Sequence, residues 1–409
     1  MVGGGIGGLV AALALERAGL EVHVYESAAA MRPLGVGINL LPHCVRVLDQ
    51  LGAMAPLLEI GIQTRELIYF NRLGQRIWYE PRGREAGYRW PQISIHRGEL
   101  QLSLHKIVQD RLGANRIHLG HHLIGFEQQR NTGYVTGYFA ASRDGHPVAS
   151  VTGDVLIGAD GIHSSVRALL FPNEGLPKWN GGLIWRAVSD SVPFLSGRSH
   201  IMAGGRQTFV AYPISKRHAD RGRALINWIA RFFADPTQGF PPEQWNRPGR
   251  FEDFLPRYED WRFDWLDVPA LIRGADVVYE FPMVDRDPLE RWTFGRVTLL
   301  GDAAHPMYPL GSNGASQAIL DADTLARALM EHKDPDDALA RYEADRRPKT
   351  AQVVANNRKG GPAAVVNLVE ERAPNGFADL DAVITQDELA RISDEYKRIA
   401  SFDLKSVNG

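Results

Sequence analysis

Apolar and polar residues follow two different periods along this 409-residue chain. Near the start, Leu9 and Leu13 recur at helical spacing and Gly19 ends the pattern, after which "LEVHVYE" forms a short apolar strand that finishes at Glu26. Strand, turn and helix follow each other again in "GDVLIGADGIHSSVRALL" and in "GRVTLLGDAAHPMYPLGSNGASQAILDADTLARALM". These segments predict a parallel sheet with flanking helices, the architecture of nucleotide-binding domains.

The intervening segments have another character. "GGLIWRAVS", "QTFVAYPIS" and "ALINWIARF" predict strands of a mainly antiparallel sheet. We therefore expect an α/β fold in which two domains are interleaved. Residues 1–64, 95–175 and 286–360 form a Rossmann-like nucleotide-binding domain, and residues 65–94 and 176–285 form the second domain. Residues 361–409 predict C-terminal helices, one of them opened by the capping box Thr385-x-x-Glu388.

Composition excludes several classes of function. Lys and Arg number 46 against 48 Asp and Glu, so no basic field indicates a nucleic-acid partner. No apolar run reaches the roughly 18 residues of a membrane span, and the start lacks a basic signal-peptide region, so we expect a cytoplasmic protein. The single cysteine, Cys44, rules out an internal disulfide and a CxxC redox pair. No HExxH motif or Cys/His cluster indicates a metal site.

The first turn carries the spacing Gly3-x-Gly5-x-x-Gly8. In dinucleotide-binding proteins the first glycine permits the tight turn, the second lets a pyrophosphate approach the backbone, and the third lets helix pack on strand. Glu26, at the end of the next strand, is placed to bind ribose hydroxyls. Only Met1 and Val2 precede the glycines, so we expect residues upstream of Met1 to complete the first strand; a stub strand is the alternative.

Two later turns favour a long ligand. Asp160-Gly161 and Gly301-Asp302 both follow predicted strands, where open α/β sheets collect ligands. Each aspartate taken alone could cap its own helix. Together with the glycine turn they favour FAD, whereas a nicotinamide dehydrogenase would leave both turns unexplained. Asp302 could accept a hydrogen bond from a ribityl hydroxyl, and the helix that starts near residues 311–314 could direct its positive end at the flavin N1–C2=O edge.

The three turn motifs together resemble the signatures of the single-component, FAD-dependent aromatic hydroxylases, the class A flavoprotein monooxygenases. "RPLGVGIN", "SIHRGELQ" and "FPMVDRDPLERW" are similar to the phenazine-1-carboxylate monooxygenase branch of that family. The resemblance implies an FAD-binding domain and a substrate-binding domain, in a monomer or homodimer. It also implies that NAD(P)H docks briefly to reduce FAD, and that reduced flavin then captures O2 as a C4a-hydroperoxide that hydroxylates an aromatic small molecule.

The resemblance also implies site residues. No acid or base is assigned to catalysis, and Pro309, Leu310 and Gly311 would lie against the isoalloxazine ring. Arg167 would serve FAD and the nicotinamide nucleotide, or else pair on its own helix, and His305 would brace its loop. The residues implied to bind FAD are Gly3, Gly5, Gly8, Glu26, Arg32, Gly37, Arg97, Leu123, Asp160, Asp302, Gly311, Asn313 and Gly314.

The substrate candidates come from the second domain. Trp185, Tyr212 and Trp228 could wall the pocket with Pro309, and Arg186 could anchor a carboxylate; packing of the domain core is the alternative for each aromatic. Strand alternation places Trp185 and Arg186 on opposite faces unless the strand is bulged. Other reactions also stay open, namely epoxidation, Baeyer–Villiger oxidation or antibiotic modification on the same fold, and a flavin-binding protein without turnover.

Overall fold

The computed structural model describes the chain except for residues 34, 130–132, 144 and 235–246. Its first sheet is parallel and joins segments from three parts of the chain. Strand β1 (Val24–Glu26) pairs with β7 (Ile117–Leu119), and β11 (Leu156–Gly158) pairs with β20 (Val297–Leu299). Val2 lies between the two pairs and forms a one-residue parallel bridge to each. The carboxyl ends of these segments therefore meet at one edge of the sheet.

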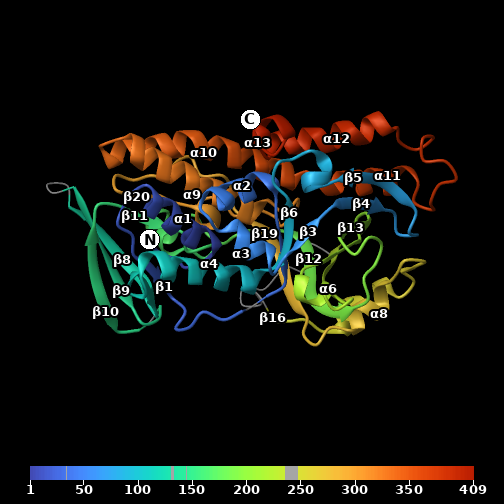
Figure 1. Cartoon of the computed structure of the whole chain (residues 1–409), viewed down its shortest axis with the longest axis horizontal. Helices are drawn as coiled ribbons and strands as arrows, with labels where there is room; N and C mark the ends of the chain where they lie inside the picture. The colour runs from blue at the N-terminus through green and yellow to red at the C-terminus, as the bar shows by residue number, and fades with distance from the viewer. Residues whose placement is uncertain (34, 130–132, 144, 235–246) are drawn as a thin grey trace.

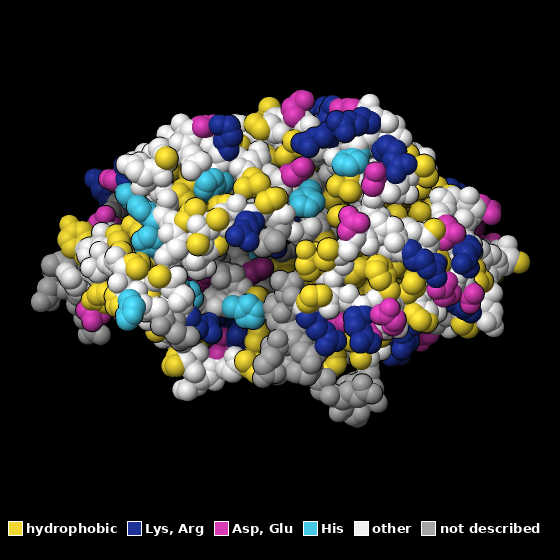
Figure 2. Space-filling view, turned by 90° about the horizontal axis from the view of Figure 1, so that it is seen from below, with side chains coloured by type: hydrophobic (Ala, Val, Ile, Leu, Met, Phe, Trp, Pro, Cys, Tyr) yellow, Lys and Arg dark blue, Asp and Glu magenta, His cyan; other side chains and the backbone are white. Residues whose placement is uncertain are grey.

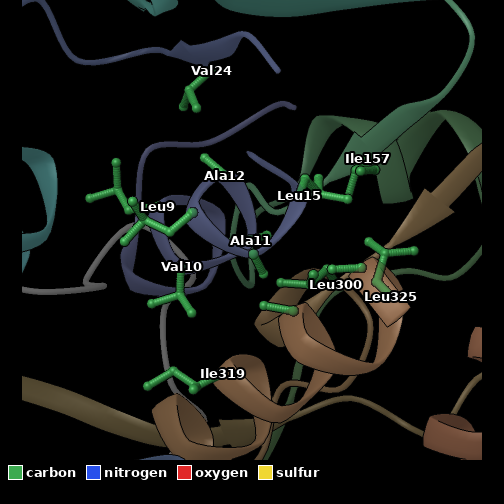
Figure 3. Packing of buried hydrophobic residues seen from close by; sticks show 14 of the residues in the cluster. Leu9, Val10, Ala11, Ala12, Leu15, Val24, Ile157, Leu300, Ile319 and Leu325 are labelled. Carbon is green, nitrogen blue, oxygen red and sulfur yellow. The ribbon is translucent and has the colours of Figure 1, made fainter. Parts of the chain in front are cut away.

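Helices α1 (Ile6–Arg17) and α9 (Asn313–Glu331) pack on this sheet and on each other. Figure 3 shows Leu9, Val10 and Leu15 of α1 near Leu300 and Ile319. Residues 8–15 of α1 are all buried, because the helix lies between the sheet and its helical neighbours. The other elements of this half are α2 (Pro42–Gln50), α3 (Met54–Leu58), α4 (Arg97–Leu112), α5 (Ser165–Leu170), and the meander β8 (His122–Gln129), β9 (Tyr134–Ala140) and β10 (Pro147–Gly153).

The second half is built on an eight-stranded sheet of order β16-β19-β12-β15-β14-β13-β4-β5. All neighbouring strands are antiparallel except β13 and β4. One face packs on α7 (Phe251–Phe254) and α8 (Val268–Arg273) in a core rich in aromatic residues. The strands are β4 (Glu66–Phe70), β5 (Arg76–Pro81), β12 (Lys178–Ser191), β13 (Ser199–Gly204), β14 (Thr208–Pro213), β15 (Ala224–Phe233), β16 (Arg247–Pro248) and β19 (Tyr279–Asp285).

A small antiparallel sheet joins the two halves. It consists of β2 (Gly37–Leu40), β6 (Gln92–His96) and β3 (Ile62–Thr64). Strand β2 contacts β15, and β6 contacts β14, so this sheet lies against the eight-stranded sheet on the face opposite the aromatic core. That face is called the inner face below, and the face toward α7 and α8 the outer face.

The last part of the chain is helical. In Figure 1, α10 (Pro335–Arg358), α12 (Gln386–Ile399) and α13 (Leu404–Asn408) run along the top of the molecule, and α11 (Ala364–Arg372) lies beside β4 and β13. The Thr385 hydroxyl accepts a hydrogen bond of 3.2 Å from the Glu388 N–H, as the capping box predicts. The predicted fold class is confirmed, while the predicted domain boundaries stay a prediction. Across the described ranges, no helix is both long and apolar enough to cross a membrane.

Candidate active site

The glycine turn is built for a close approach. A Cβ on Gly3, whose φ is +104°, would lie 2.4 Å from the Ala159 carbonyl oxygen, and one on Gly8 would lie 2.1 Å from the Gly3 oxygen. Gly5 differs, because no atom lies within 4 Å of its Cβ position. The first turn of α1 carries no acidic residue and no side-chain cap, so its N–H groups stay available. An anionic pyrophosphate therefore fits at Gly5 and the amino end of α1.

Glu26 supports this turn. Its carboxylate accepts hydrogen bonds of 2.7 Å from the N–H groups of Gly4 and Ala28. Arg32 is exposed on the segment after β1, whereas Leu123 is buried in β8, at a point where the strand register shifts. The structure places these residues around the same half of the parallel sheet. The roles predicted for them toward FAD stay predictions.

Asp160 caps the helix that follows it. Its carboxylate accepts hydrogen bonds from the Ser165 N–H at 2.7 Å and from the Val166 N–H at 3.2 Å, and from the Ser164 hydroxyl. Burial raises the pKa of Asp160, and these hydrogen bonds oppose the rise. The Asp160 Cα also lies 2.9 Å from the Cβ position of Gly3, so the capped turn forms one wall of the glycine turn.

Arg167 ties three segments together. Its guanidinium pairs with Glu174 and donates hydrogen bonds of 2.9 Å to the carbonyl oxygens of Ala303 and Ala304. The side chain is 2% exposed. Arg167 thus holds the turn after Asp302 through contacts beyond its own helix, and its predicted role toward FAD and the nicotinamide nucleotide stays a prediction.

Asp302 and Gly314 lie together at the end of β20. A Cβ on Gly314 would be 3.8 Å from the Asp302 Oδ1 atom. Desolvation raises the pKa of Asp302, while the positive charges of His305 and Arg97 counteract the rise. The Asp302 side chain nevertheless reaches solvent, so it lies in a recess open to a ligand. In Figure 2 the face of the molecule seen from below is hollowed near its centre, with an acidic side chain at depth.

A buried ionic network holds the base of α9. The carboxylate of Asp321 accepts hydrogen bonds from the Gly301 N–H at 3.0 Å and from Arg346 at 2.7 Å, and it pairs with His305 at 2.5 Å. Burial disfavours the ionised carboxyl, but the charges of His305 and Arg346 outweigh it and lower the pKa of Asp321 to about 2. His305 accordingly braces the turn that carries Asp302.

The loop before α9 packs directly on the inner face. Tyr308 and Leu310 form one apolar cluster with Ile184, Met283 and partly buried Ile229 of the eight-stranded sheet. Pro309 between them is exposed. The residues predicted to face the isoalloxazine therefore lie where the two halves meet.

Arg186 and Asn227 connect the eight-stranded sheet to strand β2 of the small joining sheet. Arg186 donates a hydrogen bond of 2.8 Å to the Gly37 carbonyl oxygen, and the Gly37 N–H donates one of 2.6 Å to the Asn227 Oδ1 atom. A Cβ on Gly37 would lie 2.6 Å from the Asn227 Cβ, so only glycine allows this approach. Gly37 is therefore needed for packing against Asn227. Its predicted contact with FAD is a separate role and stays a prediction.

The inner face carries Arg186 together with two polar side chains. Among the described residues, Arg186 makes no ion pair with an acidic side chain and its Nε has no hydrogen-bond partner, while the side chains of Arg186 and Asn227 hydrogen-bond with Tyr212. Burial lowers the pKa of Arg186, as does the nearby charge of Arg97, while Tyr212 acts in the opposite direction. The positive charge of Arg97 thus acts on the pKa of both Asp302 and Arg186. A buried cation without a counter-charge is costly, so the site favours an anionic ligand.

Trp185 and Trp228 are not part of this space. Both belong to the outer-face core, where Trp185 stacks on Phe232 and Phe254 and the Trp228 Nε1–H donates to Ser189 at 2.9 Å. Alternation along β12 and β15 places Arg186 and Asn227 on one face and the two tryptophans on the other. Tyr212 lies on the Asn227 side, beside Arg186. The structure therefore brings Arg186 and Tyr212 together and leaves the tryptophans in the core, as the packing alternative has it.

The sequence alone did not indicate Asn227 or Tyr396, for different reasons. Asn227 precedes Trp228 in the predicted strand "ALINWIARF", so alternation around the tryptophan could have indicated it as the polar residue of the opposite face. Tyr396 reaches Gly311 from the C-terminal helix α12, and no local pattern signals a contact over 80 residues.

Comparison with known proteins agrees with this geometry. Residues 1–179 and 280–357 match the family described as FAD binding domain. The chain is 48% identical over 364 residues, 88% of each chain, to phenazine 1,6-dicarboxylic acid hydroxylase PhzS of Lysobacter antibioticus. Its fold is similar to that of a salicylate hydroxylase substrate complex (TM-score 0.75, 22% identity, 100% and 96% of the two chains). It is also similar to Klebsiella pneumoniae HpxO complexed with FAD and uric acid (TM-score 0.72, 22% identity, 98% and 92%).

The chain belongs to the FAD binding domain family. It is an FAD-dependent aromatic hydroxylase, an oxidoreductase that uses NAD(P)H and O2, as the three turn motifs predict.

Proposed function

We propose that this enzyme hydroxylates a carboxylated, fused-ring aromatic compound of the phenazine type. The relative that acts on phenazine 1,6-dicarboxylic acid is 48% identical, whereas relatives named for monocyclic hydroxybenzoates are 30–33% identical. The observation that carries the proposal is Arg186, a half-buried arginine on the inner face whose guanidinium has no acidic partner in the described chain. A substrate carboxylate would supply the missing charge.

FAD supplies the redox and oxygen-transfer chemistry when it is bound. The chain's own residues bind and orient. The Gly3–Gly8 turn holds the pyrophosphate, and Asp302 accepts a hydrogen bond from the ribityl chain. Arg186 and Tyr212 hold the substrate carboxylate. Ile184, Met283 and Ile229 pack against Tyr308 and Leu310, so the ring would lie beside this apolar cluster, which excludes water from that side of the site.

The experiment is a substrate panel on the FAD-loaded protein. Phenazine-1,6-dicarboxylic acid, phenazine-1-carboxylic acid, unsubstituted phenazine and 3-hydroxybenzoate are compared for stimulation of NAD(P)H oxidation and for the mass of the product. We expect the two phenazine carboxylic acids to stimulate most, with a product that has gained one oxygen atom. If unsubstituted phenazine stimulates NAD(P)H oxidation equally, Arg186 does not anchor a substrate carboxylate. If 3-hydroxybenzoate stimulates most, the substrate is not a fused-ring compound.

A further inference from the structure

The C-terminal helices contact the loop that precedes α9. The family match ends at residue 357, so α11, α12 and α13 lie outside it. Tyr396 of α12 is 5% exposed and packs in a cluster with Leu41, Tyr88 and Phe402. Its phenol passes through this cluster and reaches residues 310–313 from the side opposite the inner face of the sheet.

The Tyr396 hydroxyl is saturated by that loop. It accepts a hydrogen bond of 2.6 Å from the Asn313 Nδ2 and lies 3.2 Å from the Leu310 carbonyl oxygen and 3.3 Å from the Asn357 Oδ1. One proton is available to donate, so it is shared between the last two acceptors. Burial raises the pKa of Tyr396, so the phenol stays neutral and keeps this donor.

The Tyr396 hydroxyl packs closely against the backbone of Gly311. A Cβ at this position would lie 1.8 Å from the Tyr396 hydroxyl oxygen, and the backbone φ of +66° favours glycine as well. The next residue, Ser312, has a φ of +59°, which is uncommon for a residue with a side chain. The loop thus holds an unfavourable backbone conformation at Ser312, and neighbouring contacts must maintain it.

A second contact ties the same helices to α9. The Gln317 side chain donates a hydrogen bond of 3.1 Å to the Ala400 carbonyl oxygen, just after α12 ends. Its Oε1 accepts one of 2.6 Å from Arg346, which belongs to the Asp321 network. The amino end of α9 is therefore fixed from the parallel sheet on one side and from α12 on the other.

We propose that Tyr396 is a positioning residue for the bound flavin. It does not touch the cofactor; it fixes the backbone of residues 310–313 and the first turn of α9, whose positive end would face the flavin. The segment outside the family match thereby sets the affinity and the electronic environment of the cofactor. The inference depends on the FAD site and is independent of which aromatic compound is hydroxylated.

The test is Tyr396→Phe, which removes only the hydroxyl. Loss of the hydroxyl leaves one of the two Asn313 amide N–H groups without its acceptor, while the other still donates to the Gly311 carbonyl oxygen, so we expect FAD to bind on the order of tenfold more weakly. We also expect a shifted visible spectrum of the bound flavin and more hydrogen peroxide per NAD(P)H consumed. The dissociation constant is measured by titrating the apoprotein with FAD and following flavin fluorescence.

The matched control is Tyr258→Phe. Tyr258 is also a buried tyrosine, and its hydroxyl lies 3.0 Å from the carbonyl oxygens of Thr208 and Arg231 in the outer-face core. We expect both variants to melt at lower temperature, with only Tyr396→Phe changing FAD affinity and spectrum. Unchanged FAD affinity and spectrum in Tyr396→Phe overturn the proposal, as does an equal change in Tyr258→Phe.

A second variant approaches the contact from the loop, in case Tyr396→Phe does not fold. Gly311→Ala would push its methyl group against the Tyr396 hydroxyl, whereas Gly222→Ala has a similar φ of +70° and no atom within 4 Å. We expect Gly311→Ala to weaken FAD binding at least tenfold and Gly222→Ala to leave it within about twofold. Wild-type FAD affinity in Gly311→Ala contradicts the proposal.

Discussion

The two faces of the eight-stranded sheet differ in how their polar groups are satisfied. On the outer face, the indole N–H groups of Trp185 and Trp228 donate to Glu280 and Ser189, inside a core of stacked aromatic rings. On the inner face, the Arg186 Nε has no hydrogen-bond partner among the described residues. In the described part of the chain the outer-face indoles are hydrogen-bonded, whereas the Arg186 guanidinium of the inner face has no acidic partner and could bind an anionic ligand. The outer face of the sheet therefore contributes mainly to the stability of the fold, and the inner face to ligand recognition.

The largest expected effect is on the stability of the outer face. Trp228→Ala should lower the free energy of unfolding by about 3–5 kcal/mol, because a fully buried indole and its hydrogen bond are lost. Denaturant unfolding measures this. The folded fraction should keep the wild-type KM for the phenazine carboxylate. A tenfold higher KM in well-folded protein would place Trp228 in the substrate site and remove the distinction between the faces.

The next effect is on recognition at the inner face. Arg186→Met should raise the KM for phenazine-1-carboxylic acid by about 10- to 100-fold, because a charge-assisted hydrogen bond is lost, and should leave the KM for unsubstituted phenazine unchanged. Stability should change little, since the variant removes an unpaired, half-buried charge together with one hydrogen bond to Gly37.

Arg198→Met is the matched control for Arg186→Met. Arg198 is also a half-buried arginine that donates a 2.8 Å hydrogen bond to a backbone oxygen, that of Gln63, but it lies elsewhere on the molecule. Its substitution should leave both KM values unchanged. If both substitutions raise KM alike, or Arg186→Met raises KM equally for the neutral compound, Arg186 is not a carboxylate anchor.

The buried ion pairs of Asp321 in the parallel-sheet half, unlike the unpaired Arg186, should make the free energy of unfolding depend on pH in the acidic range. Asp321 has a pKa of about 2, below its usual 3.8, so its pairing with His305 and Arg346 stabilises the fold fully above about pH 4. This contribution, about 2 kcal/mol, should be lost as the pH falls from 4 to 2. Unfolding curves across that range measure it. The pH dependence should diminish in Asp321→Asn and persist in Asp110→Asn, which changes a surface ion pair; an undiminished dependence in Asp321→Asn would assign it to other groups.

The smallest effect concerns the hydroxyl beside Arg186. Tyr212→Phe should raise the KM for the carboxylated phenazine by about 3- to 10-fold, because one neutral hydrogen bond to the ligand is lost. Steady-state NAD(P)H oxidation measures it, with Tyr258→Phe as a control on the outer side of the sheet. An unchanged KM removes Tyr212 from the substrate site.

The three turn motifs were predictable because their constraints are local. Gly8 is required by the carbonyl oxygen of nearby Gly3, and the turns at Asp160 and Asp302 directly follow apolar strands, although Gly3 itself also meets Ala159 from a distant segment. Local spacing therefore favoured FAD, and together with the family resemblance it predicted the fold class and the cofactor. The role of Gly37 was different, since its packing against Asn227 depends on a strand 190 residues away.

Which face of the eight-stranded sheet meets the cofactor-binding half was not predictable from local spacing. Alternation correctly separates Trp185 from Arg186, but it does not say which of the two faces meets the cofactor half. That choice is made by contacts such as Arg186 to Gly37, which join distant parts of the chain. Large aromatic residues near an expected site are therefore weak indicators, because the same side chains also fill cores.

A crystal structure with FAD and phenazine-1-carboxylic acid bound tests the central claim most directly. The account predicts the ring on the inner face beside Ile184, with its carboxylate within hydrogen-bonding distance of Arg186. The contrary result is a substrate on the outer face, in the cavity of about 430 Å³ that Trp185 lines. Electron density for the substrate in that cavity, with no anion bound to the Arg186 guanidinium, would contradict this assignment. The outer face would then bind the substrate, and the inner face would not.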